Sequence, residues 1–187
     1  MDNKKQELLA TAYKLIRTKG FDSFSYHDLS KEIGITKASI HYYYPSKEEL
    51  GLAICDLIIR NLGRLKTTVS SLASPREKLD LYIQAMFGEV KEGLMCPILS
   101  LQAEYDVLPD SMKKKIREIT EIELDIVSGI LQEGLDQGIF KFDGDAVSQA
   151  ALLVTSFKSA TLYARVLEKD LIKRIIDQFY RQLKIEK

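Results

Sequence analysis

Apolar residues recur every three or four positions along most of this chain, which is the spacing that places side chains on one face of an α-helix. The period predicts a first helix over residues 4–19, ended by Gly20. Further helices are expected over residues 46–68, 75–92, 97–107, 110–138, from Asp143 or Asp145 to about 167, and 171–183. No stretch shows the strict alternation typical of a half-buried strand, so the pattern predicts an all-α protein.

Residues 25–50 hold the local signals of two short helices joined by a tight turn and followed by the start of a third helix. Ser25 and Thr36 are good N-cap residues. Gly34 suits the left-handed backbone conformation in which many helices end. Ser46, with a glutamate three residues later, forms a capping-box pattern for the next helix. This spacing predicts a helix-turn-helix, a motif whose second helix can enter the major groove of DNA.

The second helix of this motif carries a cluster of aromatic residues, HYYYPSK, from His41 to Lys47. The helical period turns Ile40 and Tyr44 inward and leaves the other side chains facing outward or sideways. Three consecutive tyrosines and a histidine are unusual both for a small core and for a solvent-exposed surface that binds nothing. Polar and aromatic side chains on such a helix can contact base edges and phosphates. The alternative, a helical hairpin on an unrelated domain, explains the spacing but not this cluster.

A family resemblance covers residues 5–54 and rests on the stretch GFDSFSYHDLSKEIGITKASIHYYYPSKEEL. This stretch closely resembles the N-terminal domain of TetR-family transcriptional regulators. Ala38 and His41 depart from the family, which often has glycine and tyrosine there. The resemblance implies a three-helix helix-turn-helix DNA-binding domain over residues 1–48. It also implies a helical bundle for effector binding and dimerisation over residues 49–187.

The resemblance also implies which residues contact DNA. Candidate contacts to base edges are His27, Lys37, Ala38, His41 and Tyr42. Candidate contacts to phosphates are Ser25, Tyr26, Thr36, Tyr43 and Lys47. Both departures from the family lie on the expected reading face, so the operator sequence stays open.

Net charge sets a constraint on any contact with DNA. The 187 residues include 27 basic and 27 acidic side chains, and residues 1–50 hold eight Lys and Arg against seven Asp and Glu. DNA binding must therefore come from a local patch that includes Lys4, Lys5, Lys37 and Lys47, aided by helix N-termini. No apolar run reaches the ~18 residues needed to span a bilayer, and the N-terminus lacks signal-peptide features. We expect a cytoplasmic protein that does not contact the membrane.

The chain offers little for catalysis or metal binding. Two histidines, His27 and His41, without a cluster of cysteine or carboxylate ligands do not make a metal site, so we expect no metal and no cofactor. No G-x-S-x-G nucleophile elbow is present, and we expect the protein not to be an enzyme. Two cysteines do not make a disulfide framework.

The helix expected up to residue 167 is rich in small residues and has more than one apolar face. A helix that is apolar on two sides must be buried on two sides. This requirement fits a central core helix of a monomer, and it also fits a helix shared with a partner subunit. The family resemblance favours a homodimer formed through the last two helices.

The resemblance places an effector pocket among the helices of the body. Small-molecule sites combine apolar side chains with a few polar groups. Candidate lining residues are Tyr82, Met86, Phe87, Met95, Cys96, Gln102, Tyr105, Phe157 and Thr161. The simpler interpretation is that most of them are ordinary core residues.

Cys96 supports a sharper hypothesis. It directly precedes Pro97, so its thiol is expected near a helix N-terminus, a position that can activate a cysteine. The segment GLMCPILSLQAEYDVLP also resembles a subgroup of the family, some of whose members sense electrophiles or oxidants through cysteine. The alternative is an inert, buried thiol beside Met95 and Leu99.

Together these observations predict a TetR-like repressor, a homodimer that binds a palindromic double-stranded DNA operator. An unknown small-molecule effector, or oxidation of Cys96, is expected to release it. Two alternatives stay open. An all-α enzyme or ligand carrier would bind ligand tightly without binding an operator, whereas an activator or architectural DNA binder would have a cavity-free body.

Overall fold

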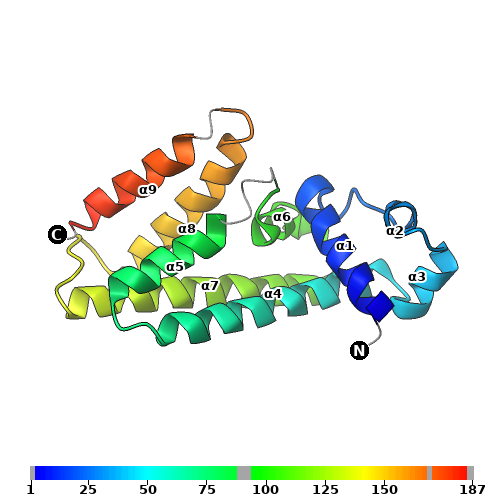
Figure 1. Ribbon diagram of the computed structural model, residues 1–187, viewed down its shortest axis with the longest axis horizontal. Coiled ribbons are helices and arrows are strands. Elements are labelled where there is room, and N and C mark those ends of the chain that lie inside the picture. Colours follow the sequence, from blue (N-terminus) through cyan, green and yellow to red (C-terminus); the bar gives the residue numbers. More distant parts are fainter. Residues whose placement is uncertain (1–2, 88–93, 168–169, 185–187) are drawn as a thin grey trace. The chain divides into compact units, whose positions relative to one another are not determined.

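A computed structural model describes residues 3–87, 94–167 and 170–184, and within them the chain forms nine α-helices, one 3₁₀ helix and no strand (Figure 1). The predicted all-α class is confirmed. In chain order the elements are α1 (Asn3–Lys19), α2 (Tyr26–Ile33), α3 (Lys37–Tyr43), α4 (Lys47–Ser70), α5 (Pro75–Phe87), α6 (Pro97–Ala103), η2 (Tyr105–Val107), α7 (Asp110–Asp136), α8 (Ala146–Tyr163) and α9 (Asp170–Gln182).

The helices group into two compact units. The first unit comprises residues 1–61 and 94–120, and the second comprises residues 62–93 and 121–187. Helices α4 and α7 each contribute residues to both units. The functional division expected between residues 48 and 49 falls within α4 and stays a prediction.

The first unit is organised around a small three-helix core. Helix α1 packs on α2, and α2 packs on α3. Each helix turns its apolar stripe toward the others, as the period of the sequence requires. Phe21 and Phe24, between α1 and α2, are both buried and meet edge to face with their ring centroids 5.7 Å apart. Other buried apolar residues of this core are Leu8, Ala12, Leu15, Ile16, Leu29, Ile40, Tyr44 and Leu50.

Helix α6 also belongs to the first unit and packs on α1. The Arg17 side chain donates through Nε to the Met95 carbonyl at 2.9 Å, and the Met95 N–H donates to the Arg17 carbonyl at 3.0 Å. The Ser100 hydroxyl donates to the Ile16 carbonyl at 2.5 Å. The bond from Met95 gives an acceptor partner to the Arg17 carbonyl near the C-terminal end of α1, where helix carbonyls lack intrahelical donors, whereas the Ile16 carbonyl also accepts the Gly20 N–H at 3.1 Å.

The second unit contains the α8–α9 pair, which is drawn in orange and red in Figure 1. The two helices pack together, and the rings of Phe157 and Phe179 meet with centroids 5.7 Å apart. Helix α9 is also tied to α5, because the Tyr180 hydroxyl donates to the Asp80 carboxylate. Burial, followed by this hydrogen bond, raises the pKa of Tyr180, so the phenol stays a donor.

A pair of opposite charges is buried inside the second unit. Lys158 Nζ of α8 lies 2.5 Å from Glu123 Oε2 of α7, and the two side chains are 6% and 0% exposed. The Tyr82 hydroxyl of α5 donates to the same carboxylate at 3.4 Å. Buried charges are tolerated only when they are paired and hydrogen-bonded. Three helices therefore have to keep the register that brings these side chains together.

Several predicted helix boundaries need correction. The single helix expected over residues 97–107 is α6 followed by η2, because the Glu104 backbone (φ −106°, ψ 11°) leaves α-helical geometry. The sequence also favours Asp110 as the N-cap of the helix that follows it, but Asp110 is the first residue of α7. Helix α8 ends at Tyr163, after which hydrogen-bonded turns replace the last predicted turn of helix. The expected continuation of α5 to residue 92 lies outside the described residues.

Of the two residues expected to start α8, Asp145 is its N-cap, since its carboxylate accepts the Ser148 N–H at 2.8 Å. Gly138, expected to end α7, adopts a φ of +69°, which favours glycine. In the part of the chain that the structure describes, no helix has both the length and the apolar character of a bilayer-spanning segment.

Candidate nucleic-acid interface

Helix α2 is fixed at both ends by the residues that its sequence predicts. The Ser25 hydroxyl accepts the Asp28 N–H, and the Asp28 carboxylate accepts the Ser25 N–H at 2.7 Å, which forms a capping box. The Lys19 ammonium also donates to the Asp28 carboxylate, at 2.7 Å. The bonds from Lys19 and Ser25 hold the pKa of the Asp28 carboxyl well below its ordinary value. At the other end, Gly34 has a φ of 74° and donates to the Ser30 carbonyl.

The turn after Gly34 leads directly into α3, the helix expected to read DNA. Thr36 is its N-cap, and the Thr36 hydroxyl accepts the Ser39 N–H at 3.2 Å. Helix α3 has seven residues and ends at Tyr43, before Pro45. Ile40, a residue of α3 itself, is fully buried. The helix is therefore short and anchored from below, so its outer face is left uncovered.

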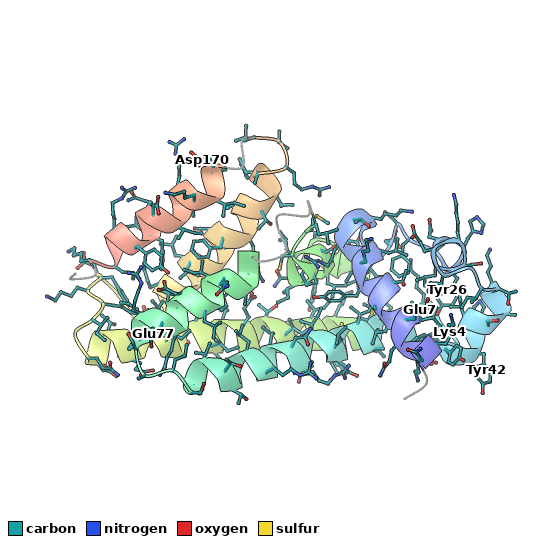
Figure 2. All side chains as sticks on the ribbon, in the orientation of Figure 1. Lys4, Glu7, Tyr26, Tyr42, Glu77 and Asp170 are labelled. Atoms are coloured by element: carbon teal, nitrogen blue, oxygen red, sulfur yellow. The ribbon has the colours of Figure 1, made fainter. Side chains whose placement is uncertain are left out.

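Four of the five expected base contacts lie on α3 and are exposed. Tyr42 is 81% exposed and projects away from the domain in Figure 2. Lys37, Ala38 and His41 are exposed as well, and His27 is exposed on α2. The fold thus brings the α3 residues onto one short surface. Whether each of them touches a base stays a prediction.

Two of the expected phosphate contacts have internal partners in this structure. The Tyr26 hydroxyl donates to the Tyr44 carbonyl at 2.8 Å, and burial raises the pKa of Tyr26 to about 12. Lys47 Nζ donates to the Asp22 carbonyl at 2.9 Å and lies about 5 Å from the rings of two phenylalanines, Phe21 and Phe24. Burial lowers the pKa of Lys47. Both side chains therefore stabilise the first unit, and the bond to Asp22 needs only one of the three N–H donors of the Lys47 ammonium.

The other three expected phosphate contacts lie at ends of α2 and α3. The hydroxyls of Ser25 and Thr36 are engaged in the caps of α2 and α3. Tyr43 is half-buried, and its ring meets that of Tyr42 with centroids 5.1 Å apart. Their roles toward DNA stay predictions.

The candidate effector residues fall into both compact units. Tyr82, Met86, Phe157 and Thr161 belong to the second unit, as does the backbone of Phe87. Met95, Cys96, Gln102 and Tyr105 belong to the first. Gln102 donates to the Thr120 hydroxyl at 2.8 Å. Cys96 is the N-cap of α6, and the residue is 7% exposed. An effector role for these residues stays a prediction.

Sequence reasoning missed the residues that depend on distant partners. Glu104 accepts the N–H groups of Phe21 and Asp22, more than eighty positions away. Glu123 and Lys158 pair across helices. Only a weak sequence signal points to this pair: Glu123 and Lys158 are charged residues at positions where the helical period predicts an apolar residue. Among the described residues, no three His, Cys, Asp or Glu side chains gather as a metal site.

An all-α chain whose N-terminal helices form a capped helix-turn-helix with an exposed second helix belongs to the class of helix-turn-helix DNA-binding proteins. Two family models match it in succession. The model described as "Bacterial regulatory proteins, tetR family" matches residues 8–54, and "Tetracyclin repressor-like, C-terminal domain" matches residues 77–179. The chain belongs to the TetR family, which is made up of transcriptional regulators.

Individual relatives agree with this assignment. The chain is 24% identical over 175 residues to the uncharacterised regulator YerO of Bacillus subtilis, covering 91% of this chain and 60% of YerO. It is 24% identical to the transcriptional repressor NemR of Escherichia coli, covering 87% of this chain and 84% of NemR. The chain thus spans about three fifths of YerO and most of NemR.

A solved structure has the same fold along nearly the whole chain. A TetR-family regulator from Agrobacterium tumefaciens superposes with a TM-score of 0.90 at 26% identity, covering 96% of this chain and 97% of that one. The match spans both family-model regions, so it supports the fold beyond the helix-turn-helix.

Proposed function

We propose that this protein is a DNA-binding transcriptional repressor that acts as a homodimer on a palindromic operator. One observation carries the proposal: α3 is a short, capped helix whose exposed side chains include Lys37, His41 and Tyr42. A helix of this kind fits the major groove of B-DNA, where polar and aromatic side chains can reach base edges. Residues 1–48 form the DNA-binding domain in this proposal, and residues 49–187 the regulatory one.

The proposed roles divide the surface around α3. His27, Lys37, Ala38, His41 and Tyr42 contact base edges, and Ser25, Tyr26, Thr36, Tyr43 and Lys47 contact phosphates. Tyr26 and Lys47 also support the domain from within through their bonds to Tyr44 and Asp22. The chain has no net charge, so a few phosphate contacts have to supply the sequence-independent part of the affinity.

The homodimer is proposed to form through α8 and α9. Apolar side chains remain exposed along α8 and just after it, including Leu152, Tyr163 and Val166 at 51%, 59% and 85% exposure. Ser156, Ser159 and Tyr163 line a groove with residues of α9. Small residues allow close helix approach, and an exposed apolar stripe next to them suits a second copy of the same surface.

Release from DNA is proposed to follow effector binding among the body helices. The buried Glu123–Lys158 pair and the Tyr82 hydroxyl give the second unit polar groups inside an apolar core. A ligand bound there has to prefer one conformation of the dimer, because only a difference in affinity between two states can shift their populations. Control through Cys96 is the second route, and it requires the buried thiol to become accessible first.

The proposal is tested by fluorescence-anisotropy binding of the full-length protein to DNA upstream of its own gene. We expect salt-sensitive, sequence-selective binding that Tyr42→Ala weakens by at least about 10-fold, since an exposed side chain can be removed without disturbing the core. Val107→Ala is the matched control, because Val107 is 73% exposed in η2, outside the helix-turn-helix. Weak binding to any DNA, equal in both variants, would contradict the proposal.

A further inference from the structure

The imidazole of His41 is held from two sides at the C-terminal end of α3. Its Nδ1 lies 3.1 Å from the carbonyl oxygen of Pro45. Its ring meets the ring of Tyr26 with centroids 4.8 Å apart and an interplanar angle of 61°. Tyr26 is itself fixed, because its hydroxyl donates to the Tyr44 carbonyl at 2.8 Å. Although His41 is exposed, its ring is therefore oriented before any DNA arrives.

The contact with Pro45 determines which nitrogen carries the proton. A backbone carbonyl oxygen can only accept, so Nδ1 has to be the donor. In the neutral imidazole only one ring nitrogen carries a hydrogen, and the other is an acceptor. Neutral His41 is thus the Nδ1–H tautomer, with a lone pair on Nε2. Tyr26 does not change this tautomer, because it contacts the imidazole with its ring and not with its hydroxyl.

From this geometry we infer that His41 is a specificity-determining residue that reads an exocyclic amine in the major groove through Nε2. The inference rests on the proposed function. The major groove offers two kinds of amine donor, N4 of cytosine and N6 of adenine. Guanine O6 and N7, thymine O4 and phosphate oxygens are all acceptors, and they give an unprotonated Nε2 nothing to bind. The operator position facing His41 is therefore cytosine or adenine on the strand that His41 contacts.

A purely structural role for His41 makes a different prediction. If the side chain only caps α3 through Pro45, its replacement weakens binding to every DNA sequence alike. If Nε2 reads an amine, replacement removes discrimination at one operator position. His41→Asn separates the two roles, because its side-chain amide can donate from about the place of Nδ1 but reaches no further toward DNA.

The test is a double-mutant cycle between protein and base, performed at a pH above the range in which histidine titrates. A duplex is first selected from a randomised pool by the full-length wild-type protein. Each adenine of one half-site is then replaced in turn by purine, and each cytosine by 2-pyrimidinone, which deletes the amine. Binding of wild type and His41→Asn to each duplex is measured by anisotropy. The cycle cancels the effect of the analogue on base pairing, since both proteins meet the same duplex.

We expect one position at which amine deletion weakens wild-type binding by about 3- to 10-fold, the range of one hydrogen bond, and leaves binding of His41→Asn unchanged. Amine deletion that affects both proteins equally at every position would overturn the inference and leave operator binding standing. Selection that yields no bound sequence would instead count against the proposed function itself.

A measurement on the free protein tests the tautomer without DNA. Long-range ¹H–¹⁵N NMR distinguishes the protonated from the unprotonated ring nitrogen. The chain has two histidines, so His41→Asn assigns the signals by removing one set. We expect Nδ1 of His41 to carry the hydrogen, and a hydrogen on Nε2 in the neutral ring would overturn the inference.

Discussion

At the scale of single residues, the turn between α2 and α3 depends on the backbone of Gly34. Its φ of 74° lies in the left-handed region, and the N–H groups of Gly34 and Ile35 both donate to the Ser30 carbonyl. An added Cβ would meet nothing within 4 Å. Any cost of a side chain at this position is therefore backbone strain and not a steric clash.

We expect Gly34→Ala to lower the free energy of unfolding by about 1–2 kcal/mol, because the Cβ of alanine makes the left-handed backbone conformation unfavourable. Gly129→Ala is the control. Gly129 also has open space around a Cβ, but it lies inside α7, where alanine should raise stability by about 0.5–1 kcal/mol. Urea denaturation of both variants measures the difference, and equal effects at the two sites would contradict the explanation.

The capping carboxylate of Asp28 links the stability of α2 to pH. Its pKa is lowered in the folded state, first by the hydrogen bond from Lys19 and then by Ser25. A lowered folded-state pKa contributes stability above the ordinary pKa of aspartate, and this contribution is lost as the pH falls toward the folded-state value. Asp28→Asn should therefore lower Tm more at about pH 7 than at about pH 3.

Thermal denaturation at the two pH values measures this effect. Asp110→Asn is the control, because its side chain is 93% exposed and lies 3.7 Å from Lys113, as in a weak surface pair. We expect little change in Tm for the control at either pH. An Asp28→Asn effect that grows as the pH falls would have the wrong sign and would refute the linkage.

At the scale of elements, Glu104 ties the end of α6 to the loop that follows α1. Its Oε2 accepts the N–H groups of Phe21 and Asp22 at 2.8 and 3.0 Å. Charge-assisted bonds to a carboxylate are stronger than neutral ones. Glu104→Ala should lower the free energy of unfolding by about 1–3 kcal/mol, since it leaves two N–H groups without their acceptor.

Glu104→Gln is the matched variant, because it keeps an acceptor oxygen and loses only the charge. We expect it to recover part of the loss. Amide hydrogen exchange reports the site directly, with faster exchange at Phe21 and Asp22 in the alanine variant than in the glutamine one. Unchanged exchange at both amides in Glu104→Ala would show that the contact does not hold the loop.

The elements that could be predicted from the sequence are those with local causes. Ser25, Gly34 and Thr36 act within three or four residues of themselves, so their roles in the caps and the turn followed from spacing alone. The break at Glu104 was missed, since that carboxylate bonds to a loop distant in sequence. The contacts of His41 were missed for the same reason: Tyr26 belongs to another helix, and no spacing rule pairs the two rings.

At the scale of the whole molecule, the family resemblance supplied what periodicity left open. The apolar pattern of α8 fitted both a monomer core and a shared interface. In the structure one side of α8 is buried, through residues such as Leu153 and Phe157, while Leu152 and Tyr163 stay exposed. A core helix of a complete monomer has no reason to expose a second apolar side. The exposed side is therefore where we expect a partner subunit.

Ser159→Arg tests this expectation without removing any apolar contact. Ser159 is exposed on α8 and lines the groove with α9, so a large charged side chain fits the monomer but keeps a second copy away. We expect the wild-type chain of 21.3 kDa to sediment as a dimer and the variant as a monomer. Operator affinity should fall by about 100-fold, because two linked half-site contacts become one.

Gly129→Arg, with open space on α7, is the control and should stay dimeric. If the Ser159→Arg protein were a dimer with full operator affinity, the dimer interface would have to lie elsewhere on the chain.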